Sequence, residues 1–204
     1  MTGAGGTDET AAMHPYDFGP STRTMAALVA ATSDDQLAGR TPCPDYTVAD
    51  LLDHIGGLTV EFTYAARKEP TPGSGGASGD GSGLEPGWRE RIARDLDALA
   101  ASWSVPAAYE GATHAGPIDL PAPVAAQVAL NEVVVHGWDL ARATGRDYDA
   151  DPAAVATCVG FVASFDAPAD DDGGLFGPRV DVGEDADAID RLVGLTGRQP
   201  GWAP

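Results

Sequence analysis

The sequence predicts an all-α protein: a four-helix bundle followed by a short irregular C-terminal extension. Two observations lead to this fold class. Four separate stretches repeat apolar residues at intervals of three and four, which is the spacing of one face of an α-helix. The segments between them are rich in proline, glycine and serine, which end helices and form turns. At 204 residues the chain is long enough to bury the core of one such domain.

The first two helices are predicted on either side of a connector that contains two prolines. Apolar residues at helical spacing indicate a first helix that begins at about Ser21. A second helix is predicted over residues 48–68, because Thr47 and Asp50 form a capping-box pattern at its start. Apolar residues then recur at helical intervals as far as Phe62. The start of this helix is the best marked in the chain.

The third and fourth helices follow a segment of unusual composition. Residues 70–87 are mostly glycine, proline and serine, which is typical of a flexible surface loop. The sequence leaves open whether this loop is a lid, and we favour an inserted linker. The third helix is predicted over residues 88–103 and the fourth over residues 125–143. The fourth helix is apolar nearly all round, which indicates that it is buried.

The remaining segments complete the predicted organisation. Residues 105–123 form a connection with four prolines, which can contain a short hairpin near His114. A further helix begins at Pro152, and a short closing helix is expected near residues 186–196. The predicted regions are a loose leader (1–19), a metal-binding bundle (20–146) and a C-terminal helix and extension packed on the bundle (147–204).

Composition points to a small-molecule substrate. The chain has 12 basic and 31 acidic residues and a formal charge of -19, which argues against nucleic acid or an anionic membrane as partner. Such acidity is also typical of a solvated surface, so it does not name the substrate.

The cysteines and the hydropathy pattern indicate where in the cell the protein is expected. Cys43 and Cys158 are far apart, so neither a disulfide framework nor a thiolate zinc site is indicated. No stretch approaches the roughly 18 apolar residues of a membrane span, and the N-terminus lacks the blocks of a signal peptide. We expect a cytoplasmic, soluble monomer or homodimer.

A carboxylate and an imidazole lie four residues apart in the fourth helix. Glu132 and His136 therefore share one helix face. Such groups are costly in a buried helix unless they are paired or coordinate a metal. His54, in the second helix, can converge on them, since metal sites in bundles are built from facing helices. We predict that His54, Glu132 and His136 are metal ligands; the alternative is an ordinary hydrogen-bonded pair in the core.

The donor types narrow the choice of metal. Two imidazoles and one carboxylate leave a tetrahedral zinc ion one open position for water or substrate, which is the arrangement of catalytic sites. The same donors suit iron. We prefer a divalent zinc ion, while nickel, manganese or iron is also compatible.

Asp139 is the predicted catalytic residue. It stands three residues after His136, where it could hydrogen-bond to a metal ligand or act as a general base. It could equally pair with Arg142 as ordinary support for the helix. The sequence does not choose between these roles.

Three further residues are candidates near the site. Trp138 and Tyr46 are predicted to line a pocket. Cys43 lies between two prolines before a helix N-terminus, where a thiol could have a depressed pKa. We favour a packing role for Cys43 over a nucleophilic one.

Three blocks of the chain resemble a known family. TPCPDYTVADLLDHIGG (41–57), NEVVVHGWDLARATGR (131–146) and FGPRVDVGEDADAIDRLVGLTGRQPGW (176–202) are similar, in order, to the actinobacterial DinB-like metal-binding proteins related to mycothiol-dependent maleylpyruvate isomerase. The resemblance implies a DinB-like four-helix bundle. It also implies metal ligands at the positions of His54, Glu132 and His136.

The resemblance also implies a class of reaction. We expect a metal-dependent thiol transferase or isomerase that uses mycothiol or a similar thiol as co-substrate and acts on a small electrophilic metabolite. The full isomerase has an additional C-terminal domain that is not expected here, so maleylpyruvate itself is not the expected substrate. Two alternatives remain: a metal-dependent hydrolase with Asp139 or His114 as proton carrier, and a non-catalytic metal- or ligand-binding bundle.

Overall fold

The computed structural model describes residues 16–72, 79–81, 83–165 and 176–204. Its helices and strands, including the short 3-10 helices η1 and η2, are α1 (Gly19–Ala31), η1 (Asp34–Gln36), α2 (Val48–Arg67), α3 (Trp88–Trp103), η2 (Pro106–Tyr109), β1 (Ala112–Ala115), β2 (Ile118–Pro121), α4 (Ala122–Ala143), α5 (Pro152–Ala163) and α6 (Ala188–Leu195). The all-α fold class with a C-terminal extension is confirmed. Each of the four predicted bundle helices lies within a few residues of its expected position.

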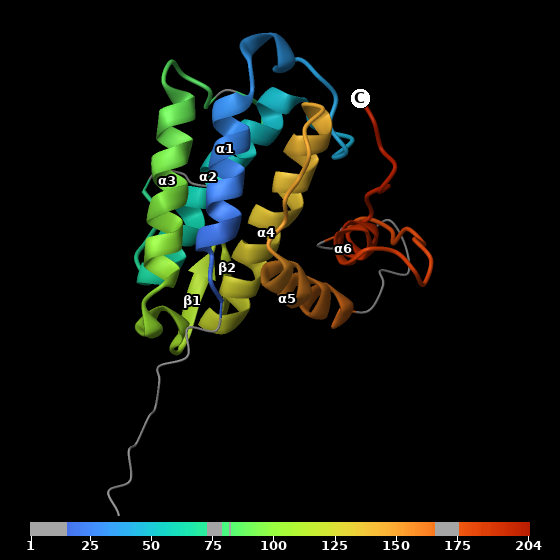
Figure 1. Ribbon diagram of the computed structural model, residues 1–204. Helices are drawn as coiled ribbons and strands as arrows, with labels where there is room; N and C mark the ends of the chain where they lie inside the picture. The colour runs from blue at the N-terminus through green and yellow to red at the C-terminus, as the bar shows by residue number, and fades with distance from the viewer. Residues whose placement is uncertain (1–15, 73–78, 82, 166–175) are drawn as a thin grey trace, which may run out of the picture.

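Helices α1 to α4 form the bundle (Figure 1). Helices α1 and α2 each pack against both α3 and α4, so α1 and α2 lie diagonally across the bundle. Helices α1 and α4 run in one direction, and α2 and α3 run in the other. This arrangement places one long face of α2 directly against α4. The contact between α2 and α4 matters most for function, because both helices carry the predicted ligands.

The sequence signals of α2 and α4 have clear structural counterparts. At the start of α2, the Asp50 carboxylate accepts a 2.8 Å hydrogen bond from the Thr47 backbone N–H, and the Thr47 hydroxyl accepts one from the Asp50 backbone N–H at 3.3 Å. This confirms the predicted capping box and fixes the register of α2. In α4, buried residues occur on nearly every side of the helix, as its apolar sequence predicts.

The connection between α3 and α4 contains the predicted hairpin. Strands β1 and β2 pair antiparallel, with His114 opposite Asp119. The hairpin packs against α2 and α4. It is a two-stranded addition to a helical protein, so the fold class is unchanged.

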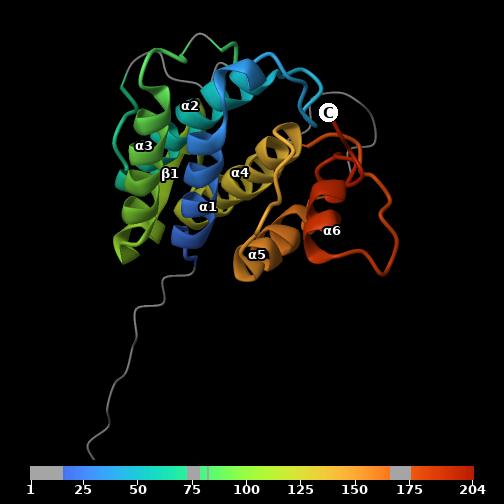
Figure 2. The same cartoon turned by 45° about the horizontal axis from the view of Figure 1, so that its top comes forward.

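The C-terminal region adds two helices beside α4 (Figure 2). Helix α5 packs on α4, and α6 packs on α5. Helix α6 ends in a tight turn, in which the Arg198 N–H bonds to the Val193 carbonyl at 2.8 Å and Gly197 has a φ of +86°. A side chain on Gly197 would meet the backbone of Gly177 at 2.9 Å, so glycine is needed here. The turn directs the chain back toward α4.

Parts of three sequence predictions lie outside the described residues: most of the leader (1–15), the centre of the glycine-rich loop (73–78 and 82) and residues 166–175 of the C-terminal extension. The described end of the predicted leader is well packed rather than loose. The Phe18 side chain is 2% exposed, and its ring stacks on Trp103 at a centroid distance of 5.9 Å. The division into three regions stays a prediction.

Within the described part of the chain, no helix combines the length and apolar character needed to cross a membrane.

Candidate metal centre

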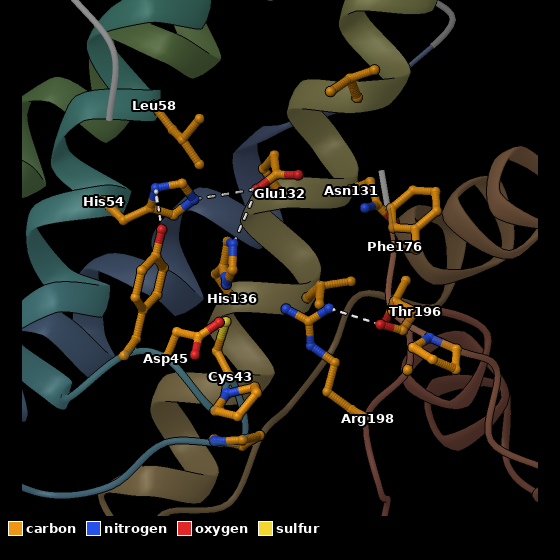
Figure 3. Close-up of a pocket in the computed structure, with 18 of the residues that line it drawn as sticks. Cys43, Asp45, His54, Leu58, Asn131, Glu132, His136, Phe176, Thr196 and Arg198 are labelled. Atoms are coloured by element: carbon orange, nitrogen blue, oxygen red, sulfur yellow. Dashed lines mark hydrogen bonds and ion pairs between the residues drawn. The ribbon is translucent and has the colours of Figure 1, made fainter. Parts of the chain in front are cut away.

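Helices α2 and α4 bring three ligand-type side chains together (Figure 3). His54 lies near the N-terminal end of α2, at the border of its buried face. Glu132 and His136 lie one turn apart on α4. Because α2 and α4 pack against each other, these three side chains point toward one another. The convergence predicted from the sequence is therefore present.

The donor atoms are spaced for a single metal ion. Oε2 of Glu132 lies 3.0 Å from Nε2 of His136 and 3.9 Å from Nε2 of His54. One donor atom from each residue lies within 4.8 Å of the other two. Donors that bind a tetrahedral zinc ion at about 2.1 Å lie roughly 3.4 Å apart. The cluster could therefore hold a metal ion after only small side-chain movements, and its nitrogen and oxygen donors suit one.

The electrostatics of the cluster favour positive charge. Burial alone would raise the pKa of Glu132, but hydrogen bonds and ion pairing with His136 and His54 outweigh it and hold the pKa well below its usual range. Burial alone would lower the pKa of His136, but the carboxylates of Asp139 and Glu132 outweigh it and raise the pKa to about 9. Two ionised carboxylates on either side of one imidazole form a site that a proton or a divalent cation can neutralise.

The ring nitrogen of each histidine that does not face Glu132 contacts another side chain. Nδ1 of His136 lies 2.9 Å from the Asp139 carboxylate, and Nδ1 of His54 lies 3.5 Å from the Tyr46 hydroxyl. When Nδ1–H donates to these oxygens, the lone pair of Nε2 is left free and faces Glu132. Partners of this kind fix the orientation and tautomer of metal-binding histidines. The arrangement around both imidazoles is typical of metal-binding histidines.

The cluster lies in the wall of a cavity of about 660 Å³. A cavity of this size can enclose a small molecule. Its wall is formed by the connector before α2, the facing sides of α2 and α4, and two C-terminal segments, 176–178 and 196–198. Apolar side chains such as Leu58 and Phe62 share this wall with the polar side chains of Asp45, Asn131 and Arg198. The three candidate ligands therefore face a space that a substrate can occupy.

Residues 18–141 match the family model of the mycothiol maleylpyruvate isomerase N-terminal domain. The matched region covers more than half of the chain and contains all three candidate ligands. The chain belongs to this family. The resemblance stated from the sequence is thereby confirmed.

Two related proteins of Mycobacterium tuberculosis match this family member: uncharacterized protein MT0763 of strain CDC 1551 and uncharacterized protein Rv0738 of strain H37Rv. Each is 35% identical over 132 residues, which is 63% of this chain and 65% of the relative. The match thus spans slightly less than two thirds of the length of these relatives. No solved structure matches the chain.

In this member of the isomerase N-terminal domain family, the structure shows which residues pair with Asp139. Its carboxylate bonds to His136 and to Arg198, whereas Arg142 donates to the Trp202 carbonyl at 3.1 Å. Pairing of Asp139 with Arg142 is therefore wrong. The side chain of Asp139 is fully buried and does not line the cavity. It is placed to hold His136, and its catalytic role stays a prediction.

The other predicted site residues divide into two groups. Tyr46 and Cys43 line the cavity, whereas Trp138 is buried away from it. The less favoured possibility of a depressed thiol pKa at Cys43 is not met, since burial raises the pKa of Cys43 to about 11 despite the nearby charge of Arg198. His114 lies on β1 beside Asp119 and is not part of the cavity wall.

Two cavity residues, Arg198 and Asn131, were not predicted. Arg198 comes from the turn after α6, and its guanidinium donates to both oxygens of Asp139, at 3.3 and 3.0 Å. The only sequence signal for Arg198 was its place in the C-terminal block that carries the family resemblance. The signal that could have identified Asn131 is that it is a polar residue in an apolar helix, next to Glu132.

Proposed function

We propose that this protein is a metal-dependent enzyme that activates a low-molecular-weight thiol of the mycothiol type and transfers it to a small electrophilic metabolite, or uses it to isomerise one. One observation carries the proposal: the donor atoms of His54, Glu132 and His136 lie within 4.8 Å of one another and face a cavity of about 660 Å³. Membership of the mycothiol maleylpyruvate isomerase N-terminal domain family supports the choice of thiol.

His54, Glu132 and His136 would hold the metal, and we propose zinc because its preferred donors are imidazole nitrogen and carboxylate oxygen. When bound, such an ion supplies Lewis-acid chemistry that lowers the pKa of a coordinated thiol or water. Nickel, manganese or iron would be held by the same donors.

The protein's own residues prepare the site for this chemistry. The Asp139 carboxylate favours a proton on Nδ1 of His136, and Tyr46 faces the corresponding nitrogen of His54. The apolar side chains of Leu58, Phe62 and Val128 border the cavity near the cluster and reduce access of water to a bound thiol. These residues orient the ligands and shield the reacting sulfur.

The proposed reaction balances without a redox partner. The thiol loses its S–H proton, and the sulfur lone pair forms a C–S bond to the electrophilic carbon. In a transfer, the leaving group departs with its bonding pair and takes up a proton. In an isomerisation, the attack moves the π pair of a carbon–carbon double bond onto a conjugated carbonyl, and rotation about the resulting single bond follows. The double bond then re-forms, the C–S bond breaks with its pair on sulfur, and the thiol regains its proton.

The hydrolase alternative has less support from the geometry. It requires a side chain that carries a proton to or from the substrate. The two predicted carriers do not serve, because Asp139 is buried in its pairs with His136 and Arg198, and His114 lies on the hairpin. We therefore place thiol chemistry first.

The partners are proposals from composition. The formal charge of -19 leads us to propose a small-molecule substrate, and neither nucleic acid nor an anionic membrane, as the partner. A cytoplasmic monomer or homodimer is proposed on the same sequence grounds.

Metal and thiol binding test the proposal directly. The chain is stripped with a chelator, reloaded with zinc or cobalt(II), and its metal content is measured. Stoichiometric metal is expected in the wild type and His114→Ala, and loss of metal in His54→Ala and His136→Ala. Retention of full metal content by both ligand variants would show that the assignment is wrong.

Addition of a thiol to the cobalt-loaded protein distinguishes the thiol enzyme from the hydrolase and from the non-catalytic binding protein. Mycothiol or cysteine is expected to add a sulfur-to-cobalt charge-transfer band, and the zinc form is expected to accelerate thiol addition to a small electrophile. A cobalt spectrum that does not respond to thiol would overturn the thiol proposal. It would favour a hydrolase or a binding module, which release of product from an ester and amide panel would separate.

A further inference from the structure

Asn131 carries a buried carboxamide with no partner in the described protein. Its residue is 2% exposed, and its Oδ1 atom is buried and accepts no hydrogen bond. No other described residue bonds to the nitrogen of this group either. A buried amide oxygen that accepts no hydrogen bond destabilises the fold, so such groups are rare in protein interiors.

The carboxamide of Asn131 belongs to the cavity wall. Asn131 precedes Glu132 on α4, and Val128 and Val135, three residues before and four after it, line the same cavity. Figure 3 shows Asn131 between Glu132 and Phe176. Val128, Val135 and Phe176 are apolar and cannot hydrogen-bond to an amide. A partner for Asn131 can therefore reach it from the cavity.

The two ends of the amide determine which hydrogen-bonding groups its partner must carry. A carboxamide offers one acceptor oxygen and two N–H donors. Neither end is bonded to a described residue, and a half-turn of the amide exchanges its oxygen and its nitrogen, so either function can be turned toward the cavity. A secondary amide supplies the complementary donor and acceptor, and a hydroxyl group does the same.

We propose that Asn131 is a specificity-determining residue that hydrogen-bonds to an amide or hydroxyl group of the small molecule bound beside the metal ligands. The position of that molecule rests on the proposed function, because the metal cluster fixes where its reactive end lies. The ligand class is therefore a thiol with an amide N–H or a hydroxyl a few atoms from the sulfur. A site built to bond such a group rejects analogues that lack it, because its own polar atoms are then left unpaired.

A matched pair of probes tests the proposal. N-acetylcysteamine carries a thiol and a secondary amide, and 2-mercaptoethyl acetate has the same shape with the amide N–H replaced by an ester oxygen. Binding of each to the zinc-loaded protein is measured by calorimetry. The wild type is expected to bind the amide about tenfold more tightly, which is the effect of losing one hydrogen bond to a buried group.

Variants assign this preference to Asn131. Asn131→Leu, which has a similar shape and no polar atoms, is expected to bind both probes equally. Asn131→Ala repeats the test if the leucine variant folds poorly. Ile118→Ala, at an exposed hairpin position outside the cavity wall, is the control and is expected to keep the preference. Equal binding of the two probes by the wild type would overturn the assignment, since the amide would then be satisfied by water alone.

A second pair of probe molecules, which contain no sulfur, distinguishes a failure of this inference from a failure of the proposed function. N-ethylacetamide and ethyl acetate, at millimolar concentrations, are compared by NMR shifts of the cavity methyl groups. Preference for N-ethylacetamide with no binding of either thiol would keep the Asn131 assignment and overturn the thiol function. Binding of none of the four probes would overturn both.

Thermal stability supplies a readout independent of binding. Because Asn131 has no partner among the described residues, Asn131→Leu is expected to melt at a higher temperature than the wild type without ligand. A lower melting temperature would show that the carboxamide stabilises the fold, and it would overturn the proposal.

Discussion

Arg198 and Asp139 form a buried ion pair that joins the C-terminal segment to the metal centre. Nη2 of Arg198 lies 3.0 Å from Oδ2 of Asp139, and the exposed fractions of the two side chains are 14% and 0%. The same carboxylate lies 2.9 Å from Nδ1 of His136. Asp139 is thus held by the C-terminal turn on one side and holds a candidate ligand on the other. The site depends on residues outside the four-helix bundle.

Removal of Arg198 is expected to destabilise the protein. In Arg198→Met, Asp139 stays buried without its cationic partner, which costs about 3 kcal/mol for buried pairs of this kind. The free energy of unfolding from urea titration measures the loss. As a control, Asp34→Asn removes the exposed pair between Asp34 and Arg89, which is expected to cost less than about 1 kcal/mol. Similar losses in both variants would contradict a special role for the buried pair.

Replacement of Asp139 by asparagine is expected to weaken metal binding without abolishing it. The amide can present N–H instead of oxygen to Nδ1 of His136, so the imidazole is no longer held in the tautomer that leaves Nε2 free. Loss of a partner of this type lowers metal affinity by about 10- to 100-fold. Competition with a metal chelator measures the change. Unaltered affinity in Asp139→Asn would show that Asp139 does not position His136.

Gly197 is expected to tolerate alanine poorly. Its φ of +86° disfavours any other residue, and an added Cβ would meet the Gly177 backbone at 2.9 Å. Gly145, after α4, has a φ of +66° but no atom within 4 Å of such a Cβ. Gly145→Ala should therefore cost about 1 kcal/mol from conformation alone, and Gly197→Ala at least about 2 kcal/mol.

Urea unfolding compares these two glycine variants, and hydrogen exchange locates the effect. Faster exchange is expected in residues 188–198 of Gly197→Ala, with little change in the bundle. Equal costs for the two variants would show that the contact with Gly177 is unimportant.

Cys43 is expected to react slowly with alkylating reagents. Burial raises its pKa from 9.0 to about 11, so near neutral pH its thiolate population is about 100-fold smaller than that of an unperturbed thiol. The rate of carbamidomethylation of Cys43 at pH 8, followed by mass spectrometry, should therefore be at least about 100-fold below that of the urea-unfolded chain. The rate should rise with pH up to about 11, because only the thiolate reacts. Rapid alkylation at pH 7 would contradict a packing role.

The helices and half of the site follow from the sequence because they depend on local spacing. The capping box at Thr47, the helical periods and the i, i+4 pair of Glu132 and His136 all reflect the geometry of single helices. The prediction that His54 belongs to the site came from the bundle architecture and the family resemblance. Prolines and glycines also placed the hairpin and the turn regions correctly.

Only the tertiary structure assigned the partners of these residues. Asp139 could pair with His136 or Arg142 at the same spacing, and the answer came from Arg198, which lies 59 residues away in the sequence. Asn131 is a polar residue in an apolar helix, but its carboxamide without a described partner depends on which side chains from other segments surround it. Spacing along a helix determines which residues share a face. What meets that face is decided by the packing of distant segments, which sequence periodicity does not encode.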